Sequence, residues 1–381
     1  MPGFSSLDDY MNETTVNGKM FRADWNKNFN PTTAAAVSEW HSFFRGTGNP
    51  AADSILDVGA NLTFFQLTDT TSGATGILHG GSVAPDYKSL INASAVTAAG
   101  ITVPGVMLLV DLLGYYRVTT VTTTTAQTTT NTLTAASTFT ADESTDIITH
   151  SNINLLPYTT VQVSTTTTLP SGLSAATNYF LIRVTDTTAK LATTYANAVA
   201  GTAINITDAG TGTHTINTLL PRYTNGAGVQ AAFINPAATA LGSATPNLSL
   251  GYTNSVATAS RATPAVLPIG KALASNSLII YSGNAGGKYG PAMPLQAGDA
   301  GIRSIETIQN STSYVSGTYT VILYRPIISL PLTTLGVAAE RDCTNLMPRI
   351  YDGACLTWLY YSSTTTPAGS SFAGHLDFAW G

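Results

Sequence analysis

Alternation of apolar and polar side chains predicts β-strands over much of the chain. Residues 319–324 and 356–360 are rich in β-branched and aromatic side chains, and in residues 372–380 a large apolar side chain or glycine recurs at every second position. The last pattern gives one buried and one exposed face, so we expect this strand to be tied into a sheet. The apolar run 102–116 is short and bounded by turn residues, which favours a buried strand.

A threonine-rich stretch, residues 118–217, differs from its surroundings. Short segments of period 2 alternate with turn sequences, which predicts a small all-β module. Strands are expected around Phe139, Ile147, Ile148, Val161, Val163, 179–184, Leu191, Ile204 and Ile206. The sequences before and after this stretch look like two parts of one domain that is interrupted by it. We therefore expect a mainly β chain: an N-terminal segment (1–87), a jelly-roll-like β-sandwich (88–117 with 218–381) and an inserted module (118–217).

The N-terminal segment contains a pattern typical of a short helix. The residues expected on its apolar face are Ala34, Val37, Trp40, His41 and Phe44. Asn30 and Pro31 suit its first turn, and Gly46 suits its end. An arm with aromatic side chains precedes it. We expect the arm and helix to dock onto a neighbouring subunit, with packing against their own domain as the alternative.

Six residues are the candidate contacts with a partner. They are Trp25 and Phe29 on the arm, Trp40 and Phe44 on the expected helix, and Glu340 and Arg341 in a charged corner. The two cysteines, Cys343 and Cys355, are expected to be buried free thiols, with a disulfide across a hairpin as the alternative.

The low content of charge bears on function. Charged residues make up 10% of the 381 residues, against about 25% in ordinary soluble proteins. The chain is 44% hydrophobic with a net charge of −5, so it should fold. A surface with so few charges is prone to association, which favours a homo-oligomer or larger assembly over a secreted β-protein with a Thr and Ser surface. Scattered basic residues argue against nucleic-acid binding, and we expect neither a signal peptide nor a membrane segment.

Few residues form a pattern typical of catalysis. The histidines do not stand at metal-ligand spacing, and no nucleophile motif is present, so we expect no enzyme, cofactor or metal. Asp142, Glu143 and Asp146 cluster on an expected loop, where an exposed polar turn is the favoured interpretation. The alternatives are a calcium site and a pair of glycan-degrading carboxylates.

Two segments of the chain have similar sequences. Residues 221–229 read Pro-Arg-Tyr-Thr-Asn-Gly-Ala-Gly-Val, and residues 348–356 read Pro-Arg-Ile-Tyr-Asp-Gly-Ala-Cys-Leu. Each has Asn-Gly or Asp-Gly before an apolar strand, which is typical of a tight turn. We expect equivalent turns in two halves of a sandwich, with a chance match as the alternative.

Residues 139–216 resemble a β module that recurs inside virion proteins of tailed bacteriophages. The sequences that carry this resemblance are residues 169–173, 177–182, 189–192 and 208–215. The rest of the chain is similar to phage structural proteins over residues 40–50, 109–116, 221–226, 294–299, 301–304 and 348–354. The resemblance implies a role in the particle and supplies no catalytic residues.

This resemblance implies a capsid-associated decoration or minor head protein, assembled in the host cytoplasm into the virion. Its expected partners are the major capsid protein, other virion proteins and further copies of the chain, with host glycans as another class of partner for the module. A tail, neck or baseplate component is one alternative. A carbohydrate-binding adhesin is another.

Overall fold

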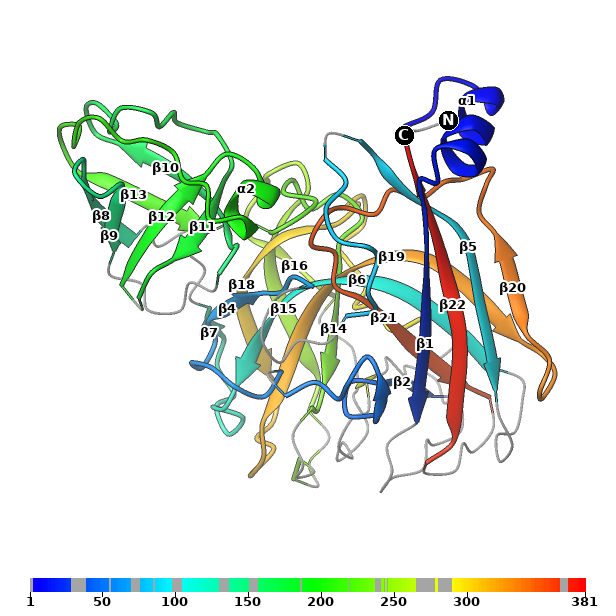
Figure 1. Ribbon diagram of the computed structural model, residues 1–381. Helices are drawn as coiled ribbons and strands as arrows, with labels where there is room; N and C mark the ends of the chain where they lie inside the picture. The colour runs from blue at the N-terminus through cyan, green and yellow to red at the C-terminus, as the bar shows by residue number, and fades with distance from the viewer. Residues whose placement is uncertain are drawn as a thin grey trace.

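The computed structural model (Figure 1) describes most of the chain. The described residues are 3–28, 39–54, 56–69, 76–84, 86–97, 105–129, 137–150, 157–185, 187–218, 220–236, 241–242, 244, 246–264, 278–279, 290–363 and 369–381. Within them, three open sheets and one closed barrel account for the β-strands of the sheet topology. The prediction of a mainly β chain built as a sandwich with a small additional β unit is confirmed.

A central sheet is built around two long antiparallel strands, β6 (Gly105–Val118) and β19 (Tyr319–Leu332). Its other members are β17 (Leu278–Ile279), β14 (Gln230–Ile234), β21 (Leu356–Ser362), β2 (Glu39–Ser42) and β4 (Phe64–Gln66). The pairing of β6 with β19 shifts where Leu323 lies opposite Gly114 and Tyr324 opposite Leu112. A β-bulge of this kind bends and twists a strand, so the two halves of β6 can face different neighbours.

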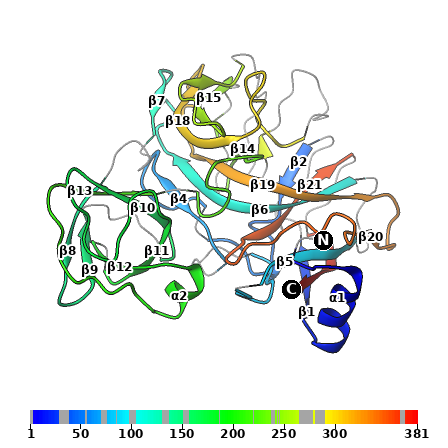
Figure 2. The same ribbon diagram turned by 90° about the horizontal axis from the view of Figure 1, so that it is seen from above.

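Two smaller sheets cover the two halves of the central sheet. The terminal sheet has the order β20 (Ala339–Asp342), β5 (Lys88–Thr97), β22 (Ser371–Trp380), β1 (Met20–Asn28) and β3 (Gly48–Asn49). The distal sheet has the order β16 (Arg261–Ala262), β15 (Leu248–Asn254), β18 (Ile302–Asn310) and β7 (Gln127–Thr128). Figure 2 shows β6 and β19 crossing the middle of the molecule, with the two smaller sheets and the barrel on different sides.

The hydrophobic core follows from this layering. Met107 and Leu109 of β6 pack with the terminal sheet, including Trp25, whereas Leu113 and Tyr116 pack with the distal sheet. The other face of the central sheet carries Val110, Leu112, Tyr115, Ile322 and Tyr324, and it is covered by residues of the segment 40–67. Both long strands are therefore buried on both faces, which explains their nearly continuous apolar sequences.

The threonine-rich stretch contains the closed barrel. Its strands, in spatial order, are β10 (Thr160–Thr165), β11 (Tyr179–Arg183), β12 (Thr188–Ala192), β9 (Ile147–His150), β8 (Ser137–Asp142) and β13 (His214–Thr218). A short helix, α2 (Tyr195–Val199), lies between β12 and β13 in the sequence. The predicted strands around residues 139, 147–148, 161–163, 179–184 and 191 are confirmed, but Ile204 and Ile206 lie outside strands.

The boundary of the inserted module stays a prediction, although the start of the stretch packs elsewhere. Val118 and Val121 belong to the core beside the distal sheet, and β7 pairs with β18 of that sheet. The barrel strands begin only at Ser137. Threonine-rich sequence therefore continues across two different structural environments, which composition alone does not separate.

The helix predicted from Ala34 to Phe44 is wrong where the structure describes it. Residues 29–38 lie outside the described residues, and residues 39–42 form β2, paired with β21. Trp40 and Phe44 have helical spacing, but an available edge of the central sheet overrides that local preference. The N-terminal helix lies earlier, at α1 (Leu7–Met11), and continues as a π-helical turn, η1 (Asn12–Val16).

The remaining predictions about elements have mixed outcomes. The strands expected at 319–324, 356–360 and 372–380 are confirmed, as is the described part of 102–116; residues 102–104 lie outside the described residues. Along β22 the alternation breaks at a bulge between Asp377 and Phe378, so Asp377 is buried as well. Cys343 and Cys355 are buried free thiols, as expected. Among the described residues, the helices are all too short or too polar to cross a bilayer.

Candidate functional site

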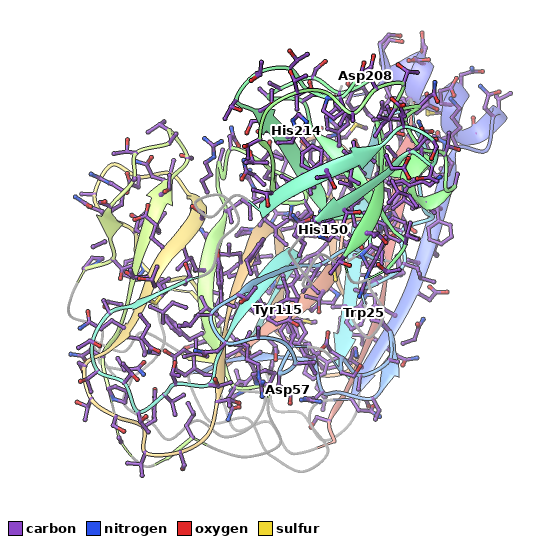
Figure 3. The ribbon with its side chains drawn as sticks, turned by 90° about the vertical axis from the view of Figure 1, so that its left-hand side faces the viewer. Trp25, Asp57, Tyr115, His150, Asp208 and His214 are labelled. Atoms are coloured by element: carbon purple, nitrogen blue, oxygen red, sulfur yellow. The ribbon has the colours of Figure 1, made fainter. Side chains whose placement is uncertain are left out.

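Three of the candidate contact residues are buried in the core. Trp25 is 2% exposed and packs on Trp358, with ring centroids 5.6 Å apart. Trp40 and Phe44 are also buried, beside the central sheet. Figure 3 shows Trp25 inside the body of the molecule. The expectation that these three side chains dock onto a partner is therefore wrong, because this chain already covers them; Phe29 lies outside the described residues.

The other two candidates lie on an edge strand. Glu340 and Arg341 are on β20, at the edge of the terminal sheet, where Glu340 is exposed. The Arg341 guanidinium donates a hydrogen bond to the Ser329 carbonyl oxygen at 3.1 Å. This places the pair at an exposed sheet edge, and their contact with a partner stays a prediction.

The carboxylate cluster of the barrel forms a turn. Asp142 accepts hydrogen bonds from the backbone and hydroxyl of Ser144, at 2.9 and 2.7 Å, and from Thr145 at 2.9 Å. The hydrogen bonds from Ser144 and Thr145 lower the pKa of Asp142. Asp146 instead accepts from the Ile206 amide at 2.8 Å. Among the described residues, no three His, Cys, Asp or Glu side chains are grouped as a metal site, so these contacts fit the polar turn.

Two polar residues of the barrel, Asp208 and His214, have hydrogen-bond partners inside it. The His214 ring lies between the Thr165 hydroxyl, at 2.9 Å, and the Ala209 carbonyl oxygen, at 3.0 Å. Asp208 accepts from the Gly210 amide at 2.8 Å. Figure 3 shows Asp208 and His214 toward one end of the barrel and His150 toward the other. These groups hold a loop in shape and do not converge on a common point.

A buried ion pair in the body fixes the segment that follows β13, the last strand of the barrel. Arg222 donates to both Asp111 carboxylate oxygens, at 2.8 and 2.7 Å, and also to the carbonyl oxygens of Leu67 and Leu112. Asp111 also accepts from the Cys355 amide at 3.0 Å. Burial opposes the charge of Arg222, but Asp111 outweighs it, so the pKa of Arg222 lies above its ordinary value. The pair is bidentate and charge-assisted, which makes it a rigid anchor.

A second buried chain of polar groups joins the body to α2. Lys88 contacts His79 Nδ1 at 3.0 Å, His79 Nε2 lies 3.4 Å from Asp69, and the Tyr195 hydroxyl donates to Asp69 at 2.5 Å. Burial lowers the pKa of Lys88 to about 8. Lys88 and His79 are each 1% exposed. This arrangement could pass a proton in principle, but Lys88 and His79 lie in the interior, so its evident role is to hold α2 against the body.

The surface beside these anchors carries a stack of arginine and tyrosine side chains, here called the Tyr–Arg stack. Arg349 lies over the Tyr87 ring, 4.2 Å from its centroid, and over the Tyr351 ring at 4.3 Å. The Tyr351 ring meets the Tyr223 ring edge-on at 5.0 Å, and Arg325 lies 5.2 Å from the Tyr223 centroid. Tyr87 is 47% exposed and Arg349 is exposed as well. Cation–π contacts hold a guanidinium at a fixed position on such a surface.

Backbone pairing places the members of the stack together. The Ile350 amide donates to the Lys88 carbonyl oxygen at 2.9 Å, and the Leu90 amide donates to the Pro348 carbonyl oxygen at 2.9 Å. Arg349 is thereby held alongside the start of β5, directly after Tyr87. Tyr223 and Tyr351 come from the two segments of similar sequence, 221–229 and 348–356. The sequence similarity was the available signal, but it did not reveal that the segments touch.

Exposed apolar side chains gather on the N-terminal segment next to the stack. Leu7, Met11, Val16 and Met20 are 60, 51, 73 and 44% exposed, and we call these four residues the N-terminal patch. Phe4 anchors the segment by packing with Ile91 and Met347, and its ring meets that of Tyr10 edge-on at 5.2 Å. The Tyr87 amide donates to the Gly381 carbonyl oxygen, and Gly3 lies against Tyr87. The start of the N-terminal segment therefore lies against Tyr87 of the stack.

Comparisons with known proteins find no match: no protein-family model matches the chain, and neither a search of curated proteins nor a search of solved structures finds one.

Proposed function

We propose that the chain is a structural protein of a tailed-phage particle, bound to the capsid as a decoration or minor head protein that stabilises the shell through contacts between subunits. The N-terminal patch is the observation that carries the proposal. Scattered exposed apolar residues are ordinary, but four of the large exposed apolar residues fall within the short segment 7–20. Grouped apolar surface is typical of a site that another protein covers.

The scarcity of charge supports the same conclusion. Burying a charged group in an interface costs desolvation energy, whereas burying leucine, valine or methionine is favourable. With charged residues at 10% of the chain, few groups oppose burial. A specific interface buries roughly 800 Å² on each partner, which is more than the N-terminal patch alone supplies. We therefore expect the interface to extend over the Tyr–Arg stack.

Two alternatives make different predictions. A tail, neck or baseplate component would use the same surfaces elsewhere on the particle. A carbohydrate-binding adhesin would bind a defined glycan as an isolated monomer, through the barrel or the exposed tyrosine rings.

The proposal is tested on particles purified from the phage that encodes the chain. Mass spectrometry should detect the protein, and cryo-EM should place it on the head. The double variant Leu7→Glu/Met11→Glu should fold normally and enter particles at least tenfold less than the wild type, because it puts charge into the buried contact. Val256→Glu, at a residue 77% exposed and far along the chain, is the matched control.

Three results would contradict the proposal. Absence from particles would exclude a virion role. Density on the tail would replace the decoration role with the tail alternative. Specific glycan binding by a monomer that is missing from the head would favour the adhesin.

A further inference from the structure

We propose that Arg349, held between Tyr87 and Tyr351, binds the carboxylate of an aspartate or glutamate on a neighbouring protein of the particle. The inference rests on the proposed function and names the chemistry of the partner at the same surface. It concerns one guanidinium, its two rings and the apolar residues beside them.

Arg349 differs from the paired arginines of the chain. Four arginines bind carboxylates of this chain within 3.0 Å: Arg22 with Asp377, Arg45 with Asp57, Arg222 with Asp111 and Arg261 with Asp299. In the part of the chain that the structure describes, no hydrogen bond or ion pair joins the Arg349 guanidinium to another residue; its recorded contacts are the two tyrosine rings. Its five N–H donors therefore keep their capacity for an external acceptor.

The two ring contacts leave the N–H groups of the guanidinium available to that acceptor. The rings of Tyr87 and Tyr351 lie 4.2 and 4.3 Å from the guanidinium carbon, within cation–π range, and this fixes the side chain. A fixed guanidinium loses less conformational entropy when it binds. The N–H groups at its edge form a planar fork that matches the two oxygens of a carboxylate. The structure thus preorganises a group that suits bidentate recognition.

Neighbouring charges do not block a carboxylate. Asp86 and Asp352 are the acidic residues next to Tyr87 and Tyr351 in the sequence. Asp86 pairs with Lys19 at 2.9 Å, and Asp352 already accepts hydrogen bonds from the Ser82 hydroxyl, at 2.5 Å, and from the Val83 amide, at 3.3 Å. The buried Lys88 amine interacts electrostatically with the same carboxylate. The local negative charge is therefore offset within the chain.

The surroundings favour a protein over an acidic sugar. A sugar needs several polar groups for its hydroxyls, whereas Gly3, at the start of the N-terminal segment, lies against Tyr87, and Leu346, three residues before Arg349, is 62% exposed. Leu346 is joined to this region through Met347, which packs with Phe4 in one cluster. Tyrosine and arginine surrounded by apolar contacts are the residue types that dominate binding energy at protein interfaces.

The test is a titration followed by NMR on the full chain with labelled arginine and tyrosine side chains. The probe is the peptide acetyl-Ala-Glu-Ala-amide, and its Gln counterpart is the neutral control. We expect the Glu peptide to shift the Arg349 and Tyr87 resonances and to bind at least tenfold more tightly than the Gln peptide. Arg349→Lys should weaken binding about tenfold, because an ammonium lacks the planar fork, and Arg349→Gln should abolish it. Arg303→Gln, which removes one charge from β18, should leave binding unchanged.

Other results would overturn the inference. Equal affinity for the Glu and Gln peptides would exclude carboxylate recognition. Tighter binding of glucuronate or N-acetylneuraminate would assign the site to a glycan, and tighter binding of inorganic phosphate would assign it to a phosphate group. Because the titration needs no particle, its failure leaves the proposed function standing. Conversely, if the Glu peptide binds but this protein is absent from particles, the carboxylate site stands and only the virion role is rejected.

Discussion

Segments 221–229 and 348–356 begin with the same Pro-Arg pair and use it in opposite ways. Arg222 is buried in a bidentate pair with Asp111, whereas Arg349 is exposed between two tyrosine rings. The turns themselves correspond, since Gly226 and Gly353 both have positive φ, at 77° and 74°. The comparison teaches that the shared sequence sets the turn, while the neighbours contributed by β5 and β6 decide what each charge does.

The largest expected effect comes from removing the buried arginine. Arg222→Met leaves Asp111 buried without its partner, so we expect a loss of about 3–5 kcal/mol in the free energy of unfolding, measured by urea denaturation. The double variant Arg222→Met/Asp111→Leu should recover most of this loss, because no buried charge remains. Arg349→Met should cost at most about 1 kcal/mol, since only exposed cation–π contacts are lost. Equal losses for the two arginines would refute the contrast between buried and exposed roles.

Substituting Gly226 and Gly353, the corresponding glycines of the two turns, tests the comparison of the two segments further. A Cβ on Gly226 would lie 2.4 Å from the Ile302 carbonyl oxygen, whereas on Gly353 it would meet the Tyr195 ring at 2.7 Å. Both alanine variants bear the cost of positive φ, about 1–2 kcal/mol, but a ring can move more easily than backbone. We expect Gly226→Ala to cost about 2–4 kcal/mol and Gly353→Ala about 1–2 kcal/mol. Thermal unfolding of both variants measures this order, and the reverse order would show that the barrel contact is the stiffer one.

A smaller effect concerns the third cation, Lys88, which is buried like Arg222 but has no hydrogen bond to a carboxylate among the described residues. Its pKa is about 8 in the folded chain, below the ordinary 10.5. Between these values the unfolded chain binds more protons, so stability rises with pH from 8 to 10, by about 2 kcal/mol from this residue. Lys88→Met should flatten that rise in urea titrations at several pH values. An unchanged slope would mean that Lys88 stays charged when folded.

The sequence predicted the strands better than the surfaces. Residues 372–380 showed period 2, and residues 356–360 were rich in β-branched and aromatic side chains; both patterns are local. The helix prediction failed at Trp40 because pairing with β21 is a long-range contact. The helix α1 had a local signal that was missed: the side chain of its N-cap, Ser6, accepts from the Asp9 amide at 3.0 Å. The backbone amide and hydroxyl of Ser5 both donate to the Asp9 carboxylate.

The candidate site was beyond sequence reasoning for a physical reason. Tyr87 and Arg349 are far apart in the chain and meet only because residues 348–350 run beside β5. The composition shows a chain with few charges, but it does not show which aromatic side chains are exposed. Trp25 and Trp40, which we predicted as contacts, are large aromatic side chains buried in the core. An exposed aromatic residue such as Tyr87 carries no sequence mark that separates it from a buried one.

Hydrogen bonding at the junction of barrel and body has a consequence for how such a chain can change over generations. The strands of the barrel close on one another, so the barrel offers no sheet edge to the body. At the junction, the Gln66 side-chain amide pairs with the backbone of Thr160, at 3.0 and 2.9 Å, much as a neighbouring strand would. A different closed unit could replace the barrel if it presented one backbone amide and one carbonyl to this glutamine and a hydroxyl to Asp69 in place of Tyr195. Recombination could then exchange what the outer unit displays while the body inherits its packing unchanged.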